Sequence, residues 1–283
     1  MKNIKLLRAI EMTQINEIIP NDEDYSIINL LFQNKLLKSK EINTNTLTIT
    51  CLDLISRERI NVKINDEIES IKMSKNILKS KNNNDLKLME NMEFTINSKQ
   101  MKKLNQRDQT VLKMFKDINK DYHFDLKSMF DKISKKEIAI KFAKYFNDYS
   151  KSLKRETKYD ESNCKDILQD GNFTIEGNLL KKEWKEFSNE LKSNRSLYSI
   201  DNDKDFDKYL IYGRCFNMKK DIIKNIDMID GNYESQLFKF LTYDGDDLLK
   251  MIFDKGISNS KVERKGDGSV PVGNSKYFVP GFG

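Results

Sequence analysis

Residues 43–64 read NTNTLTITCLDLISRERINVKI and join a helical pattern to a strand pattern. Apolar residues recur at i, i+4, i+7 and i+8, the spacing of one helix face, at Leu47, Cys51, Leu54 and Ile55. Asn43 and Asn45 precede this run and suit the N-cap of a helix. Ile60, Val62 and Ile64 then alternate with polar residues, as in a half-buried strand. The stretch predicts a helix followed by a strand, with Cys51 in a core.

A second strand pattern follows at Met92, Phe94 and Ile96. The polar run Lys79 to Asp85, KSKNNND, predicts a loop between the two strands. Before residue 43, Pro20-Asn21-Asp22 indicates a helix start, and apolar residues at helical spacing follow at Tyr25, Ile28, Leu31 and Phe32. Helices followed by a two-stranded ribbon favour a winged helix, so we expect such a unit over residues 21–100, behind an N-terminal lead of residues 1–20.

Residues 101–160 predict a second helical or winged-helix-like unit. One helix is marked by Leu104, Val111, Leu112, Phe115 and Ile118, and a shorter one by Leu126, Met129, Phe130 and Ile133. Ser134 to Glu137 has the spacing of a capping box and predicts the start of a third helix. The apolar stripe of this helix is aromatic-rich and is expected in the core: Ile138, Phe142, Tyr145, Phe146, Tyr149 and Leu153.

The rest of the chain predicts a linker at 161–178, a helical domain at 179–257 and a flexible tail at 258–283 that is rich in glycine. Within the linker, Asn172 to Ile175 lies between two glycine-containing pairs and indicates a hairpin or a domain joint. The expected fold class is α+β, mostly α, with one or two winged-helix-like units followed by a helical domain.

Composition sets the class of protein. At 283 residues the chain exceeds the usual domain of about 100–150 residues, which favours two or three compact units. No stretch of about 18 apolar residues occurs, so we expect neither a membrane span nor a signal peptide. The chain has three cysteines, Cys51, Cys164 and Cys215, which lie far apart in the sequence. Their odd number and wide spacing argue against a zinc ribbon or a disulfide framework.

No catalytic, cofactor or metal residue is predicted. His123 is the only histidine and lies between aromatic residues, so we expect it at the edge of a helical core. Asp201, Asp203, Asp205 and Asp207 alternate as in a calcium loop, but Phe206 and Tyr212 occupy the positions that need glycine and glutamate. These aspartates are expected at the start of a helix instead. Phosphate-binding and nucleophile-elbow motifs are missing from the sequence.

Positive charge is concentrated in the middle of the chain. Residues 101–160 contain 16 basic and 9 acidic groups, whereas residues 1–100 contain 15 and 14 and residues 161–283 contain 19 and 21. The 42 lysines accompany 29 asparagines and 3 alanines, a bias typical of an AT-rich genome, so a solvated helix face is the favoured explanation of the excess. Contact with nucleic acid or an anionic surface would use Arg57, Arg59, Lys63, Lys135, Lys136, Lys141, Lys144 and Lys151.

Three segments, in this order, resemble the cytoplasmic region of the YciQ-like predicted membrane proteins, a family of unknown function. They are Ile18 to Leu31 with the helix and strand of 47–64, Glu176 to Phe187 with its Gly-Trp-Phe pattern, and Phe206 to Gly213. The resemblance implies a cytoplasmic module at the inner face of the membrane, tethered by segments absent from this chain. Many members have a membrane hairpin where this chain has only the polar stretch 157–176. The family offers no catalytic residues to transfer.

The expected function is therefore a cytoplasmic interaction or regulatory module with a protein partner and no catalytic activity of its own. One alternative is a nucleic-acid-binding winged-helix regulator, in which residues 45–57 would form the recognition helix, although Arg57 is the only cation there. A second alternative is an enzyme with a carboxylate site, although pairs such as Glu183 and Glu186 arise freely among 44 acidic residues and give it no support.

Overall fold

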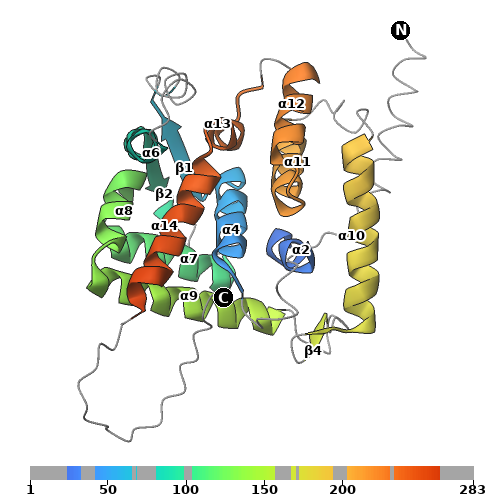
Figure 1. The fold of residues 1–283 in the computed structure, drawn as a ribbon, viewed down its shortest axis with the longest axis horizontal. Helices are drawn as coiled ribbons and strands as arrows, with labels where there is room; N and C mark the ends of the chain where they lie inside the picture. The colour runs from blue at the N-terminus through green and yellow to red at the C-terminus, as the bar shows by residue number, and fades with distance from the viewer. Residues whose placement is uncertain are drawn as a thin grey trace, which may run out of the picture.

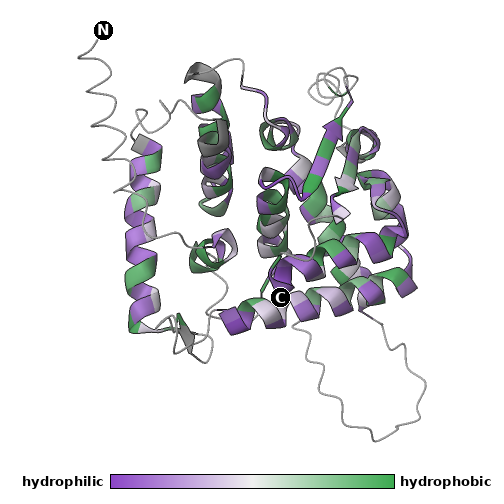
Figure 2. Ribbon diagram, turned by 180° about the vertical axis from the view of Figure 1, so that it is seen from behind, coloured by the Kyte–Doolittle hydropathy of each residue, from purple (hydrophilic) through white to green (hydrophobic). Residues whose placement is uncertain are grey.

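The protein is an α+β protein dominated by helices (Figure 1). The computed structural model describes residues 24–32, 42–65, 68, 81–98, 104–156, 167–169, 172–193, 203–229 and 233–261. The expected helix start at Pro20 to Asp22, the lead 1–20 and tail residues 262–283 lie outside these ranges. Figure 2 shows hydrophilic residues along the outer helices, and the apolar residues form a shared core.

A small antiparallel sheet holds the order β1-β2-β3, with β1 at Ile60–Ile64, β2 at Met92–Ile96 and β3 at His123–Asp125. The two predicted strands are confirmed, and Val62 pairs with Phe94. The third strand was not expected, and it pairs Phe124 with Phe94. Three residues are too few for an alternating pattern to be visible in a sequence, which explains the omission.

Helix α4 (Thr44–Ser56) lies at the centre of the molecule and is buried on almost all sides (Figure 1). As predicted, Asn43 caps it by accepting a hydrogen bond from the backbone N–H of Thr46 at 3.2 Å, and Cys51 is fully buried. Helix α2 (Tyr25–Phe32), also expected, packs beside it. Helix α4 therefore contributes both its apolar and its threonine face to the interior.

The loop predicted at 79–85 is wrong from residue 81 onward, because Lys81–Glu90 forms helix α6. Its apolar residues Leu88 and Met89 are buried, and α6 packs against α8 and β2. Burial of these residues outweighs the low helix propensity of the three asparagines at its start.

Helices α7 (Gln106–Asn119), α8 (Leu126–Ile133) and α9 (Lys136–Glu156) confirm the three helices predicted for this region. The aromatic stripe of α9 is core as expected, with Phe142 and Tyr149 buried. The capping-box prediction was wrong: Ser134 ends α8, and its hydroxyl donates to the Phe130 carbonyl oxygen at 2.8 Å.

Of the hairpin and the domain joint expected for Asn172 to Ile175, the structure has a hairpin, β4 (Leu168–Gln169) with β5 (Asn172–Phe173), although Ile175 already belongs to a helix. In the part of the chain that the structure describes, five helices follow. They are α10 (Ile175–Ser193), α11 (Asp203–Cys215), α12 (Lys219–Ile229), α13 (Gln236–Thr242) and α14 (Gly245–Ser260). Because α14 continues to Ser260, the expected tail does not begin at Ser258.

Helix α14 connects the end of the chain to its middle. It packs along α9 and also contacts α4 and α8. Its Phe253 lies 6.2 Å from Phe115 of α7 and 5.6 Å from Phe142 of α9, between ring centroids. The division into units at 100, 160 and 178 stays a prediction, as does the winged-helix description. The sheet takes strands from both sides of residue 100.

Candidate functional site

The exposed face of α9 carries three of the eight cations that the sequence singled out, together with Arg155. Lys136, Ile140, Lys144, Lys151 and Arg155 are all exposed and are spaced by four, four, seven and four residues, so they share one side of the helix. We call these five residues the α9 row. At about 1.5 Å per residue the row extends roughly 28 Å. Within the described part of the chain, its four cations have no ion-pair partner.

An aliphatic side chain interrupts this row of charges. Ile140 is 48% exposed, between Lys136 and Lys144. Lys135, immediately before α9, is exposed as well. Lys141 lies off the row and donates a hydrogen bond to the Asp117 carbonyl oxygen at 3.1 Å. The α9 row is thus a mixed cationic and apolar surface.

The remaining predicted contacts lie on other elements. Arg57 ends α4 and is held by Asp53 at 2.6 Å and Asp108 at 2.8 Å, and these carboxylates raise its pKa. Arg59 is half-buried before β1, and Lys63 is exposed on β1 opposite Glu93. These three residues are not part of the α9 row, and Arg57 is committed to an internal ion-pair network.

Helix α4 is not available to read a nucleic-acid groove. Thr46, Thr48 and Thr50 are fully buried. The Thr46 hydroxyl donates to Asn29 Oδ1 at 3.1 Å, and the Thr48 hydroxyl donates to the Thr44 carbonyl oxygen at 3.0 Å. The threonine side of α4, which the sequence predicted as a recognition surface, therefore forms its hydrogen bonds inside the protein.

The position predicted for His123 was wrong. It lies on β3 with 59% of its side chain exposed, and not at the edge of a helical core. Its Nδ1 is 2.9 Å from the Thr95 hydroxyl, and its Nε2 is 3.8 Å from a Glu93 carboxylate oxygen. The short strand that was missed in the sequence accounts for this position.

A buried arginine that the sequence did not single out connects three helices. Arg107, at the start of α7, is 1% exposed. It donates to Glu156 Oε2 at 2.8 Å, at the end of α9, and to Asp24 just before α2. Nearby, the Tyr149 hydroxyl is 2.8 Å from the Thr50 hydroxyl, which is 2.7 Å from that of Ser26. Burial raises the pKa of Tyr149 and of Glu156.

A second buried network joins α11, α12 and α14. Lys219 Nζ lies 2.7 Å from Asp246, 2.9 Å from Asp247 and 3.3 Å from Asp244. Arg214 Nε is 2.5 Å from the fully buried Asp246. Because burial disfavours an isolated charge, it raises the pKa of Asp246, while the carboxylates raise that of Lys219. The groups neutralise one another, so this cluster fastens helices together.

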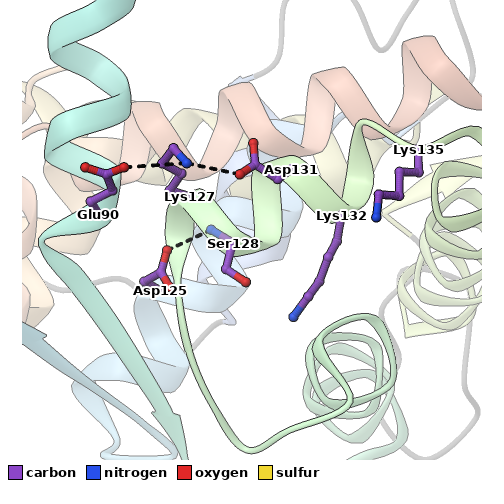
Figure 3. Close-up of a pocket in the computed structure, with 7 residues that line it drawn as sticks. All are labelled: Glu90, Asp125, Lys127, Ser128, Asp131, Lys132 and Lys135. Atoms are coloured by element: carbon purple, nitrogen blue, oxygen red, sulfur yellow. Dashed lines mark hydrogen bonds and ion pairs between the residues drawn. The ribbon is translucent and has the colours of Figure 1, made fainter.

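An open polar hollow of about 410 Å³ lies between α6 and α8 (Figure 3). Lys127 is 3.1 Å from Asp131 and 3.5 Å from Glu90, and Asp125 accepts from the Ser128 backbone N–H at 2.7 Å. Lys132 donates to the Asn119 carbonyl oxygen at 3.0 Å. The polar groups that line the hollow mainly satisfy each other, which gives it little to offer a ligand.

Carboxylates and possible ligand sets give no assembled site. Glu183 and Glu186 are both exposed on α10, and Asp203, Asp205 and Asp207 lie within α11. Asp207 accepts hydrogen bonds from Tyr233 at 2.7 Å and Ser235 at 2.6 Å. Among the residues that the structure describes, no group of three His, Cys, Asp or Glu could hold a metal ion. In the same ranges no helix is long and apolar enough to cross a membrane.

Comparisons with protein-family models, with curated proteins and with solved structures find no match to this chain.

Proposed function

We propose that this protein is a cytoplasmic interaction or regulatory module of a membrane-associated protein, without catalytic activity of its own, and that it docks through the α9 row. The observation that carries the proposal is the alignment of Lys136, Lys144, Lys151 and Arg155 on one exposed side of α9. The other side of the helix is fixed in the core by Phe142 and Tyr149, so the cations are presented on a rigid support.

An anionic lipid surface fits this face better than nucleic acid does. A straight row of about 28 Å matches a planar array of headgroups, and the exposed Ile140 suits the apolar boundary beneath them. Each cation near such a surface contributes about 1 kcal/mol, so four contribute about 4 kcal/mol, a weak and reversible attraction. The helix expected to recognise duplex DNA, α4, is buried and cannot enter a groove.

Vesicle co-sedimentation tests the proposal, with phosphatidylcholine vesicles compared with vesicles that also contain phosphatidylserine. We expect binding only to the anionic vesicles, and weaker binding at high salt. The triple variant Lys136→Glu, Lys144→Glu, Lys151→Glu should weaken binding roughly hundredfold or more, since each reversal removes about 1 kcal/mol of attraction and adds repulsion.

The matched control is Lys87→Glu, Lys220→Glu, Lys224→Glu, which makes the same charge change at exposed positions on α6 and α12. It should bind almost as well as the unaltered chain. Equal losses in both variants would show that only net charge matters and would contradict docking through α9. Binding to a random DNA duplex without vesicle binding would favour the nucleic-acid alternative.

A further inference from the structure

The corner between β5 and α10 exposes apolar side chains that the proposed function does not use. Ile175 is 76% exposed and Leu179 is 57% exposed. They are four residues apart in the first two turns of α10, so they lie on the same side of the helix. Phe173 of β5, half-buried, precedes them.

The packing of α10 on its other side keeps Ile175 and Leu179 exposed. Trp184 and Phe187 are buried, and their rings lie 5.4 Å and 5.3 Å from that of Tyr212 of α11. Ile175 precedes Trp184 by nine residues, which at about 100° per residue places it on the opposite side of the helix. At Gly177 an added Cβ would lie 2.2 Å from the Ile167 carbonyl oxygen. The helix therefore cannot rotate to hide Ile175 and Leu179 without losing its core contacts.

The corner and α9 lie along the same edge of the molecule. Figures 1 and 2 both place β4 and the first turns of α10 at the edge along which α9 runs, with α10 rising away from it. Charges of both signs accompany the apolar residues: Lys181 Nζ lies 4.8 Å from the centre of the Phe173 ring, and Lys182, Glu176 and Glu183 are exposed. A flat anionic surface could contact this edge at both places.

We propose that Ile175 and Leu179 insert at the boundary between headgroups and acyl chains of an anionic bilayer, while the α9 row lies against the headgroups. This inference rests on the proposed function and adds a second, apolar contact to it. Two aliphatic side chains are too small for a stable protein interface, which buries about 800 Å² on each partner. The exposed neighbours on α10 include Lys182, Glu176 and Glu183, so the two aliphatic side chains supply the apolar contact of an interfacial anchor while the α9 row supplies the attraction to anionic lipid.

Tryptophan quenching by brominated lipids tests the insertion. Trp184 is the only tryptophan and is fully buried, so a Leu179→Trp variant adds one exposed reporter. Its added fluorescence should be quenched on phosphatidylserine vesicles that contain brominated phosphatidylcholine. Glu186→Trp is the matched control, because it is exposed on the same side of α10 about 10 Å further along, and its fluorescence should be quenched much less.

A second variant separates the two contacts. Ile175→Asn with Leu179→Asn keeps every charge, so salt-sensitive binding through α9 should persist while the affinity falls at least about tenfold. Two results together would contradict insertion of the corner: the asparagine pair binds as tightly as the unaltered chain, and the tryptophan at position 179 is not quenched. They would do so even if the triple glutamate variant of α9 no longer binds. Failure of the unaltered chain to bind vesicles would overturn both proposals. Concentration-dependent self-association that the asparagine pair abolishes would identify a second copy as the occupant.

Discussion

Arg107 occupies a position that few arginines occupy, with its guanidinium fully inside the protein between the start of α2 and the end of α9. Removing two charges from water is costly, and their attraction compensates only when the geometry is good. Here Asp24 and Glu156 both remain partly exposed, which lowers the cost on the acidic side. The arginine is therefore a bridge whose removal leaves carboxylates without a counter-ion.

Replacing this residue should be severely destabilising. We expect Arg107→Leu to lower the free energy of unfolding by about 3–5 kcal/mol, because Asp24 and Glu156 lose their counter-ion and buried Asp108 is left with Arg57. Urea denaturation measures the change. Arg155→Leu, at an exposed position of α9, should change stability by no more than about 0.5 kcal/mol. A similar small effect at both positions would show that the buried bridge is not structural.

At the scale of elements, the crossing of α9 and α14 depends on one glycine. An added Cβ at Gly256 would lie 2.5 Å from Phe142 Cδ1 and 3.0 Å from Ile133 Cγ2. The absence of a side chain thus lets α14 approach α9 closely enough for Phe253 to reach Phe142. The local sequence gives glycine no such role, because a glycine near a helix end is normally interpreted as a terminator.

Gly256→Ala should therefore destabilise the protein although alanine favours helices. Helix propensity alone predicts a gain of about 1 kcal/mol, whereas overpacking costs typically 1–3 kcal/mol. We expect a net loss in urea denaturation, and adding Phe142→Leu should recover part of it by making space. A more stable Gly256→Ala protein would mean that the two helices can separate without cost.

Long periodic elements were predictable from the sequence, and those that depend on distant contacts were not. Helix α9 and strands β1 and β2 have repeating patterns that report their buried faces. Helix α6 and strand β3 form because other elements cover Leu88 and Phe124. For the candidate site, the lysines of α9 were visible in the sequence. The apolar corner of α10 was not, because exposure of Ile175 depends on the packing of Trp184.

At the scale of the whole molecule, a single cluster of buried side chains extends from Ile27 to Phe253. Trp184 reports on the part formed by α2, α10 and α11, and far-UV circular dichroism reports on all helices. Because α4 contacts α2, α11 and α14, we expect both signals to change in one coincident urea transition. Two separate transitions would show that the units predicted around residues 100 and 160 unfold independently.

The position of α14 also affects how the protein is made. Thr44 at the start of α4 donates a hydrogen bond to Asp254 of α14, 210 residues later in the chain. Synthesis proceeds from the N-terminus, so the surfaces of α4 and α9 that α14 covers are complete long before α14 leaves the ribosome. Until then the sides of Phe115 and Phe142 that Phe253 covers stay open to solvent, and this is the interval in which a chaperone has most to bind.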